Sequence, residues 1–206
     1  ELSRKRGAAR GTIQEGLAAN LDFNRIVEIV GDNLAGLFAG DTFGFALLDA
    51  QTGLAVYPYT LYQGKRINIP SQPISGIGGH VFNTGQAIVI NRDFQSYIKR
   101  YQSHLLFGVT APRSGIYVPV LAGNKPIGVI SAQNYEREEA YSDALVRLLE
   151  IVAAHMGTAL ENARLFSETQ RLLKETEQRS SELAILNSAR AAMSKTLDIQ
   201  SMTRTV

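Results

Sequence analysis

The strongest constraint on the fold of this chain lies in the residues from Tyr141 to about Lys195. Apart from Gly157, this stretch contains no glycine and no proline, and it is rich in Leu, Ala, Glu, Arg, Lys and Gln, which are strong helix formers. A continuous helix of this length would run for roughly 80 Å. Such a helix is longer than a domain of this size needs to cover its own core, so we expect part of it to contact something else.

The apolar pattern changes along this helix. The first half is dense enough in apolar residues to serve two faces, one against a sheet and one against a partner. The second half thins to one stripe with steps of four and three residues, which is the spacing of a coiled-coil seam. Because several seam positions are polar, the seam is weak, and a single solvated helix with surface salt bridges is the alternative. The stripe comprises Leu165, Thr169, Leu172, Thr176, Arg179, Leu183, Leu186, Arg190 and Met193.

We therefore expect a parallel homodimer through the long helix, because its apolar surface exceeds what one domain can bury. The residues expected at the dimer contact are Leu145, Val152, Leu165, Leu172, Leu183 and Leu186.

The charge balance and the residue counts exclude several classes of function. The chain has 21 basic and 19 acidic residues, which is too balanced to indicate binding to nucleic acid or to an anionic membrane surface. It has no cysteine, which excludes disulfides, thiolate metal sites and cysteine nucleophiles. No apolar run approaches the roughly 20 residues of a membrane-spanning helix. We expect a cytoplasmic location, and we interpret the chain as a fragment of a longer protein.

Periodicity before the long helix predicts an α+β fold. Strand-like segments and turn residues between two helical regions indicate an antiparallel sheet with helices on one face and a lid on the other. The expected order is a helix within 12–38, strands at 42–49 and 54–62, a connector at 65–74, a short helix from Gly76, a strand at 87–91, an aromatic segment at 93–107, a hairpin of 116–121 and 127–135, and the long helix.

The end of the chain resembles its beginning. Leu21-Asp22-Phe23 and Leu197-Asp198-Ile199 share a pattern 176 residues apart, within similar helical surroundings. We interpret this as the start of a second, truncated copy of the same module. Chance similarity between two amphipathic helices is the alternative.

Three segments together resemble a GAF domain. The hairpin from Tyr117 to Glu138 (YVPVLAGNKPIGVISAQNYERE) resembles the penultimate strands of the family. The run from Asp143 to Phe166 resembles its terminal helix with the ending "ALENA.L". Gly78, Val81 and Thr84-Gly85 resemble its "G…V…TG" segment. The similarity extends from about Ile13 to Phe166, and the residues that follow resemble linkers between consecutive GAF modules in bacterial sensor kinases and nucleotide cyclases.

The resemblance implies a PAS-like six-stranded antiparallel sheet, a pocket under the lid, and helices that dimerise in parallel. It divides the chain into a basic N-terminal segment at 1–11, a GAF domain at 12–166, a coiled-coil linker helix at 167–182 and the truncated start of a second GAF domain at 183–206.

The expected lid, residues 92–112, is rich in aromatic residues, and we predict that it covers an aromatic-lined pocket for a small molecule. Rings that fill a closed core without ligand are the alternative. Ser131 and Gln133 share one strand face, which meets either the lid or the helices. The candidate ligand-binding residues are Tyr59, Tyr97, Tyr101, His104, Arg113, Ser114 and Tyr117.

Several chemistries of related GAF domains lack their residues in this chain. Ser103-His104 stands roughly where bilin-binding members carry Cys-His, so covalent bilin attachment there is excluded. Asn91-Arg92 and Phe94 resemble the opening of a cyclic-nucleotide pattern, but no Asp-Glu pair follows. Free methionine sulfoxide reductases resemble this fold and use catalytic cysteines, which this chain lacks. The three histidines are far apart in sequence. We therefore expect no enzyme activity, no cofactor and no metal.

The sequence thus predicts a cytoplasmic GAF sensory and dimerisation module of a signal-transduction protein such as a two-component system. It would bind an unknown small molecule and relay a conformational signal through paired helices to a downstream kinase or cyclase domain. The alternatives are a ligand-free structural module that only dimerises and relays, and an enzyme that works in the pocket.

Overall fold

The computed structural model describes residues 23–104 and 110–202. Its six strands form one antiparallel sheet in the order β3-β2-β1-β6-β5-β4. The strands are β1 (Thr42–Leu48), β2 (Ala55–Tyr62), β3 (Lys65–Arg66), β4 (Ile88–Ile90), β5 (Ser114–Ala122) and β6 (Lys125–Asn134). The expected six-stranded antiparallel sheet is confirmed. The two-residue strand β3 lies within the segment that the sequence indicated as a connector.

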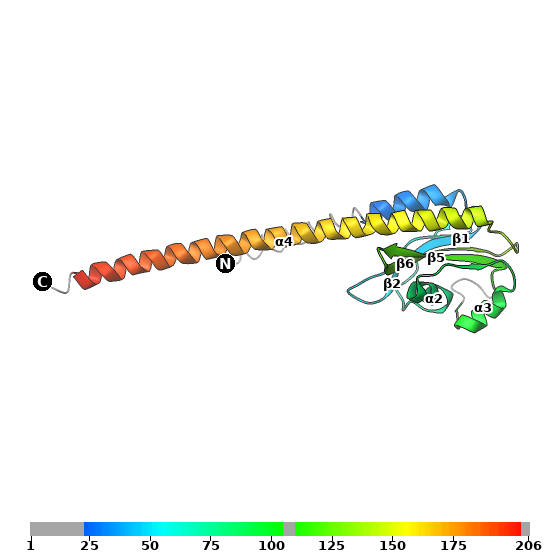
Figure 1. Cartoon of the computed structure of the whole chain (residues 1–206), viewed down its shortest axis with the longest axis horizontal. Coiled ribbons are helices and arrows are strands. Elements are labelled where there is room, and N and C mark those ends of the chain that lie inside the picture. Colours follow the sequence, from blue (N-terminus) through cyan, green and yellow to red (C-terminus); the bar gives the residue numbers. More distant parts are fainter. Residues whose placement is uncertain (1–22, 105–109, 203–206) are drawn as a thin grey trace. The chain divides into compact units, whose positions relative to one another are not determined.

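Helices cover both faces of the sheet (Figure 1). A helix at residues 23–35 and the first part of α4 (Asp143–Met202) cover one face, and α2 (Gly76–Thr84) and α3 (Phe94–Tyr101) lie on the other. The fold class predicted from the sequence is therefore confirmed. The described residues between 23 and 163 form one compact unit, and in the second unit the structure describes the continuation of α4 from Arg164.

The main core lies between the sheet and α4. Strand residues on one face, such as Phe43, Phe45 and Ile130, pack into one buried cluster with residues from both helices. The α4 members of the cluster recur at steps of four, three and four residues, which keeps them on one side of the helix. They are Leu149, Ala153, Met156 and Leu160.

Gly157 allows α4 to approach the sheet closely. A Cβ atom at this position would collide with the backbone carbonyl of Leu121, on β5. This contact explains why a helix otherwise free of glycine carries one here, despite a cost of about 1 kcal/mol in helix propensity relative to alanine.

Two of the residues expected at the dimer contact, both on α4, also contact the core of their own domain. Leu145 and Val152 are partly buried against the main core. Leu148 and Ile151 lie on the same helix with 40% and 57% of their surface exposed. A contact of Leu145 and Val152 with a partner stays a prediction, whereas the 3.6-residue period places Leu148 and Ile151 on the free side of the helix.

A buried carboxylate fixes the loop that leads into α4. Asp41 accepts hydrogen bonds from Asn134 Nδ2 at 2.6 Å and from Tyr141 Oη at 3.0 Å. The Asn134 amide oxygen accepts from the backbone N–H groups of Glu136 and Arg137. Desolvation by burial raises the pKa of Asp41, although its hydrogen bonds with Asn134 and Tyr141 act in the opposite direction. The ends of β1 and β6 and the start of α4 are thus joined by one network.

The expected second module stays a prediction. Residues 183–202 continue α4 without interruption, and residues 203–206 lie outside the described part of the chain. The N-terminal half of the sequence similarity, before residue 23, lies outside it as well.

Replacing Asp41 should change stability in a pH-dependent manner. The pKa of Asp41 is higher in the folded state than in the unfolded state, so the folded state binds the proton more tightly. The resulting contribution to stability is fully present below the unfolded-state pKa, and it is lost as the pH rises through the folded-state pKa. Urea unfolding from about pH 4 to about pH 8 should therefore show wild type losing stability relative to Asp41→Asn. Parallel profiles of the two proteins would contradict this.

Asp41→Ala should cost about 2 kcal/mol or more at every pH, because it leaves the amide of Asn134 and the hydroxyl of Tyr141 without their buried acceptor. The comparison with Asp41→Asn separates the lost hydrogen bonds from the lost charge.

Gly157→Ala should destabilise the domain by about 1–3 kcal/mol, although alanine favours helices, because the new Cβ displaces α4 from β5. Gly36→Ala is the matched control, since nothing lies within 4 Å of a Cβ at that position. Urea unfolding of both variants measures the difference, and an equal effect at the two sites would show that α4 does not depend on this approach.

Candidate ligand-binding pocket

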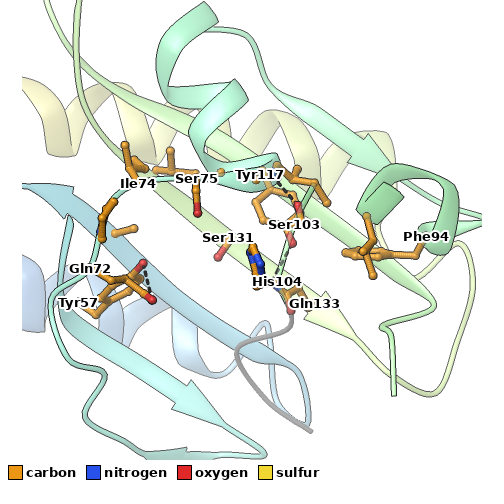
Figure 2. A pocket seen from close by; sticks show the side chains of 17 residues that line it. Tyr57, Gln72, Ile74, Ser75, Phe94, Ser103, His104, Tyr117, Ser131 and Gln133 are labelled. Atoms are coloured by element: carbon orange, nitrogen blue, oxygen red, sulfur yellow. Dashed lines mark hydrogen bonds between the residues drawn. The ribbon is translucent and has the colours of Figure 1, made fainter. Parts of the chain in front are cut away.

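A cavity of about 180 Å³ lies on the sheet face opposite α4 (Figure 2). It is bounded by β1, β2, β5 and β6, by residues 72–75, by the first turn of α2, by α3 and by Ser103 and His104. Typical pockets for drug-sized ligands have about 300–1,000 Å³. The cavity therefore suits a molecule smaller than a nucleotide.

Strand alternation provides the floor of the cavity. The lining includes Ser131 and Gln133 of β6 and Tyr117 of β5. The residues that precede Ser131 and Tyr117, Ile130 and Ile116, belong to the main core on the other face. The sequence left open which face Ser131 and Gln133 would meet, and the structure places them in the pocket.

A β-bulge in β2 places two neighbouring tyrosines on opposite faces. Phe45 pairs with Tyr59 and Leu47 pairs with Val56, so that two residues of β2, Tyr57 and Pro58, stand opposite one residue of β1. Tyr57 consequently lines the pocket, whereas Tyr59 lies in the main core.

The prediction of Tyr59 as a ligand-binding residue is therefore corrected. Its ring lies against Gly31, where any Cβ would collide with it. Its hydroxyl donates to Asp32 at 3.0 Å, and the Arg66 guanidinium lies 3.7 Å from the ring centroid. Strict alternation would have kept Tyr57 and Tyr59 on one face, and only the bulge separates them.

The first turn of α2 faces the cavity and is held by the segment after α3. The backbone N–H of Ile77 donates to Ser103 Oγ at 2.8 Å. Gly76 has a φ of +65°, and a Cβ there would lie 2.5 Å from the same oxygen. Ser75 occupies the N-cap position, but its side chain makes no capping hydrogen bond. Its hydroxyl points toward the middle of the cavity in Figure 2.

Two tyrosine–glutamine pairs line the pocket (Figure 2). Gln133 Nε2 donates to Tyr117 Oη at 2.8 Å, and Gln72 Nε2 donates to Tyr57 Oη at 3.1 Å. Tyr135 Oη donates to the amide oxygen of Gln133 at 3.3 Å. Burial raises the pKa of Tyr117, so its phenol is neutral at physiological pH.

The described lining carries no Asp, Glu, Lys or Arg side chain. Among the lining residues that the structure describes, His104 carries the one imidazole side chain. Its imidazole points into the cavity in Figure 2. The pocket is therefore polar but nearly uncharged.

The structure brings together only part of the predicted site. His104 and Tyr117 line the pocket. Tyr97 and Tyr101 of α3 are half-buried and pack against a smaller core cluster beside it, with the Tyr101 ring 4.6 Å from that of His80. Arg113 is exposed. Phe107 of the expected lid lies outside the described residues.

Ser114 is also absent from the lining. It is fully buried, and its hydroxyl donates to the carbonyl of Arg137 at 2.8 Å. It has the same strand parity as Ile116, so it faces away from the pocket and instead holds the loop before α4.

Gln72 and Ser75 were missed by the sequence reasoning. They belong to an irregular segment with two prolines, in which no periodicity indicates the direction of a side chain. Only the folding of this segment over β2, where Ala55 and Gln72 exchange backbone hydrogen bonds, brings them to the cavity.

No group of three His, Cys, Asp or Glu residues in 23–104 and 110–202 is arranged to hold a metal ion. Within the same ranges, none of the helices combines the length and apolar character that crossing a membrane requires.

Comparisons with known proteins identify the family and the fold of this chain. Residues 20–161 match the sequence model of the GAF domain. No protein of curated description shows significant sequence similarity to the chain. The GAF domain of an Acinetobacter phosphoenolpyruvate-protein phosphotransferase is 19% identical at a TM-score of 0.55, with 70% of this chain and 93% of that one covered.

Two other solved structures broaden the comparison. Residues 122 to 287 of a methyl-accepting chemotaxis protein are 14% identical at a TM-score of 0.59, with 70% and 92% of the chains covered. A type II free methionine-R-sulfoxide reductase from Thermoplasma acidophilum is 16% identical at a TM-score of 0.50, with 66% and 96% covered. At these identities the similarity shows a shared fold alone.

Ser103→Ala should loosen the first turn of α2, because it removes the acceptor of the Ile77 N–H group. The expected cost is about 1 kcal/mol, seen as amide exchange of Ile77 that is about fivefold faster. Ser96→Ala is the control, since that hydroxyl donates to Asp93 O at the exposed start of α3. Unchanged exchange at Ile77 would mean that Ser103 does not hold α2.

Proposed function

The chain belongs to the GAF domain family, and from this premise we propose that it is a sensory and dimerisation module of a cytoplasmic signal-transduction protein. A small molecule binds in the pocket, and the long helix relays the resulting change to an output domain such as a kinase or a cyclase. The activity is regulatory and not enzymatic.

One observation carries this proposal: the same strands contribute to the pocket and to the core beneath α4. On β6, Gln133 and Ser131 line the cavity, and Ile130 and Ala132 pack in the main core. A ligand that shifts β6 therefore acts directly on the surface that supports α4. It can do so only through a difference in affinity between two conformations of the domain.

The sulfoxide reductases of this fold provide the enzymatic alternative. Those enzymes resemble the chain in fold and use catalytic cysteines, and the chain contains no cysteine. This supports a binding role for the pocket, although not a particular ligand.

Dimerisation through α4 is the second part of the proposal, and the partner is another copy of this chain. The exposed large apolar side chains of α4 include Leu165, Leu172, Leu183 and Leu186, all of which belong to the predicted seam. Its polar positions Thr169 and Thr176 donate their hydroxyls to the carbonyls of Leu165 and Leu172 in their own helix, each at 2.8 Å. These threonines can then turn their methyl groups to a partner without leaving a hydroxyl unsatisfied.

Within the folded domain, Leu148 and Ile151 of α4 are exposed as well, and so are Ile29 and Leu37. Exposed apolar residues on both described parts of the chain support self-association. In the proposed parallel arrangement, each seam residue meets its own counterpart on the other copy.

Leu172→Asp should weaken the dimer by at least about tenfold, because it places a charge in the seam. Leu173→Asp is a closely matched control, since Leu173 is 58% exposed and Leu172 is 48% exposed, but Leu173 lies outside the stripe. Sedimentation equilibrium across micromolar concentrations measures both. A wild-type monomer with intact helical circular dichroism would refute the dimer.

The absence of native cysteine allows a test of the orientation. Separate Thr169→Cys and Arg190→Cys variants should each form a disulfide with their own copy in a parallel dimer. An antiparallel dimer could cross-link through at most one of them.

Native mass spectrometry of freshly purified protein tests the sensory role, because it reports the oligomer and any retained small molecule together. A dimer with a bound small molecule supports a sensor. A ligand-free dimer in which amides at residues 92–104 exchange as slowly as those of β1 and β6 would favour a structural relay module instead.

A further inference from the structure

We propose that the pocket binds a small monocarboxylate, with its carboxylate accepting hydrogen bonds from the Tyr117 hydroxyl and from the first turn of α2. This inference rests on the proposed sensory function, which requires a ligand without defining its chemistry.

The first argument is the direction of a chain of hydrogen bonds beside the cavity. Tyr135 donates its hydroxyl proton to Gln133 Oε1, which leaves the Gln133 amide N–H to donate to Tyr117 Oη. Tyr117 therefore acts as an acceptor toward Gln133, and its own proton remains to be donated. The residue is only 8% exposed, and no acceptor among the described residues takes that proton. A buried donor without an acceptor costs about 1–3 kcal/mol, so the site favours a ligand that supplies an oxygen acceptor.

The second argument is the N-terminus of α2, a helix of nine residues that lines the same cavity. The Ile77 N–H group is taken by Ser103, and the Gly79 N–H group by the Ser75 carbonyl. In the described part of the chain, the N–H groups of Gly76 and Gly78 have no such acceptor. Among the residues that the structure describes, nothing lies within 4 Å of a Cβ built at Gly78, so an atom of a ligand can approach this turn closely. Helix N-termini favour negative charge.

The third argument is the charge of the lining. Without Asp or Glu, the described lining offers no counter-ion to a cationic ligand, and the absence of Lys and Arg from it disfavours a phosphate ester or a dicarboxylate. Residues 105–109 read Leu-Leu-Phe-Gly-Val and add no ionisable side chain in any position. The described lining therefore favours a ligand with a single negative charge over one with two.

The fourth argument concerns the rest of the ligand. Apolar side chains complete the lining, among them Ala46, Ile74, Phe94 and Val129. With a cavity of about 180 Å³, they favour a short alkyl or a single aromatic group beyond the carboxylate.

A matched series of probes tests the proposal on the full chain: butanoate, butanamide and butylamine share one carbon skeleton and differ in charge, and acetate and benzoate vary the size. Butanoate or benzoate should saturably shift the amide NMR resonances of Gly76 and Gly78. Butanamide should bind about tenfold more weakly, and butylamine should not bind. If no carboxylate shifts these resonances, or if the amine binds equally well, the inference is overturned.

Tyr117→Phe keeps the ring and removes the donated proton, so carboxylate binding should weaken about tenfold. Tyr62→Phe makes the same chemical change at the end of β2, outside the pocket lining, and should leave binding unchanged. Undiminished binding by a folded Tyr117→Phe protein would also overturn the inference. The wild-type resonance shifts decide the question if this variant does not fold.

The outcomes separate the ligand class from the sensory function. A non-carboxylate retained in native mass spectrometry would refute the monocarboxylate and leave the sensory function standing. Carboxylate binding that leaves amide exchange of α4 and the dimer constant unchanged would support the ligand class and contradict the relay.

Discussion

The structure depends on the two-sided character of its sheet. Successive side chains of a strand point to opposite faces, so β6 can place Ser131 and Gln133 in a polar cavity and Ile130 and Ala132 in an apolar core. The two faces cannot move independently, because each strand is one covalent backbone. A polar cavity and a helix-supporting surface in the same domain are thus a consequence of strand geometry.

The attachment of α4 to this sheet is close at two places. At Gly157 the helix backbone approaches β5 without an intervening side chain. At its start, the Asp41–Asn134–Tyr141 network joins the helix to the ends of β1 and β6. Ser114 adds β5 to the same region through the carbonyl of Arg137. These contacts leave little room for slippage, so a shift of the central strands would be transmitted to the helix.

The pocket combines rigid orientation with low charge. Gln72 and Gln133 each hold a tyrosine hydroxyl, and Ser103 fixes the first turn of α2. The groups that would meet a ligand are therefore oriented before binding, which lowers the entropic cost of association. Their neutrality favours recognition by hydrogen-bond direction and by shape.

The sequence by itself determined five of the six strands, the antiparallel sheet type and the long helix, because these depend on local periodicity. The hairpin turn at Gly123, the alternation from Val129 to Gln133 and the α4 pattern can all be read along the chain, whereas the two-residue strand β3 lies in a segment expected to be a connector. Only the tertiary structure decided which side chains meet. A one-residue bulge moved Tyr59 out of the pocket, strand parity turned Ser114 away, and an irregular segment brought in Gln72 and Ser75. Side-chain direction at bulges and in irregular segments depends on contacts between residues distant in sequence, which no local pattern encodes.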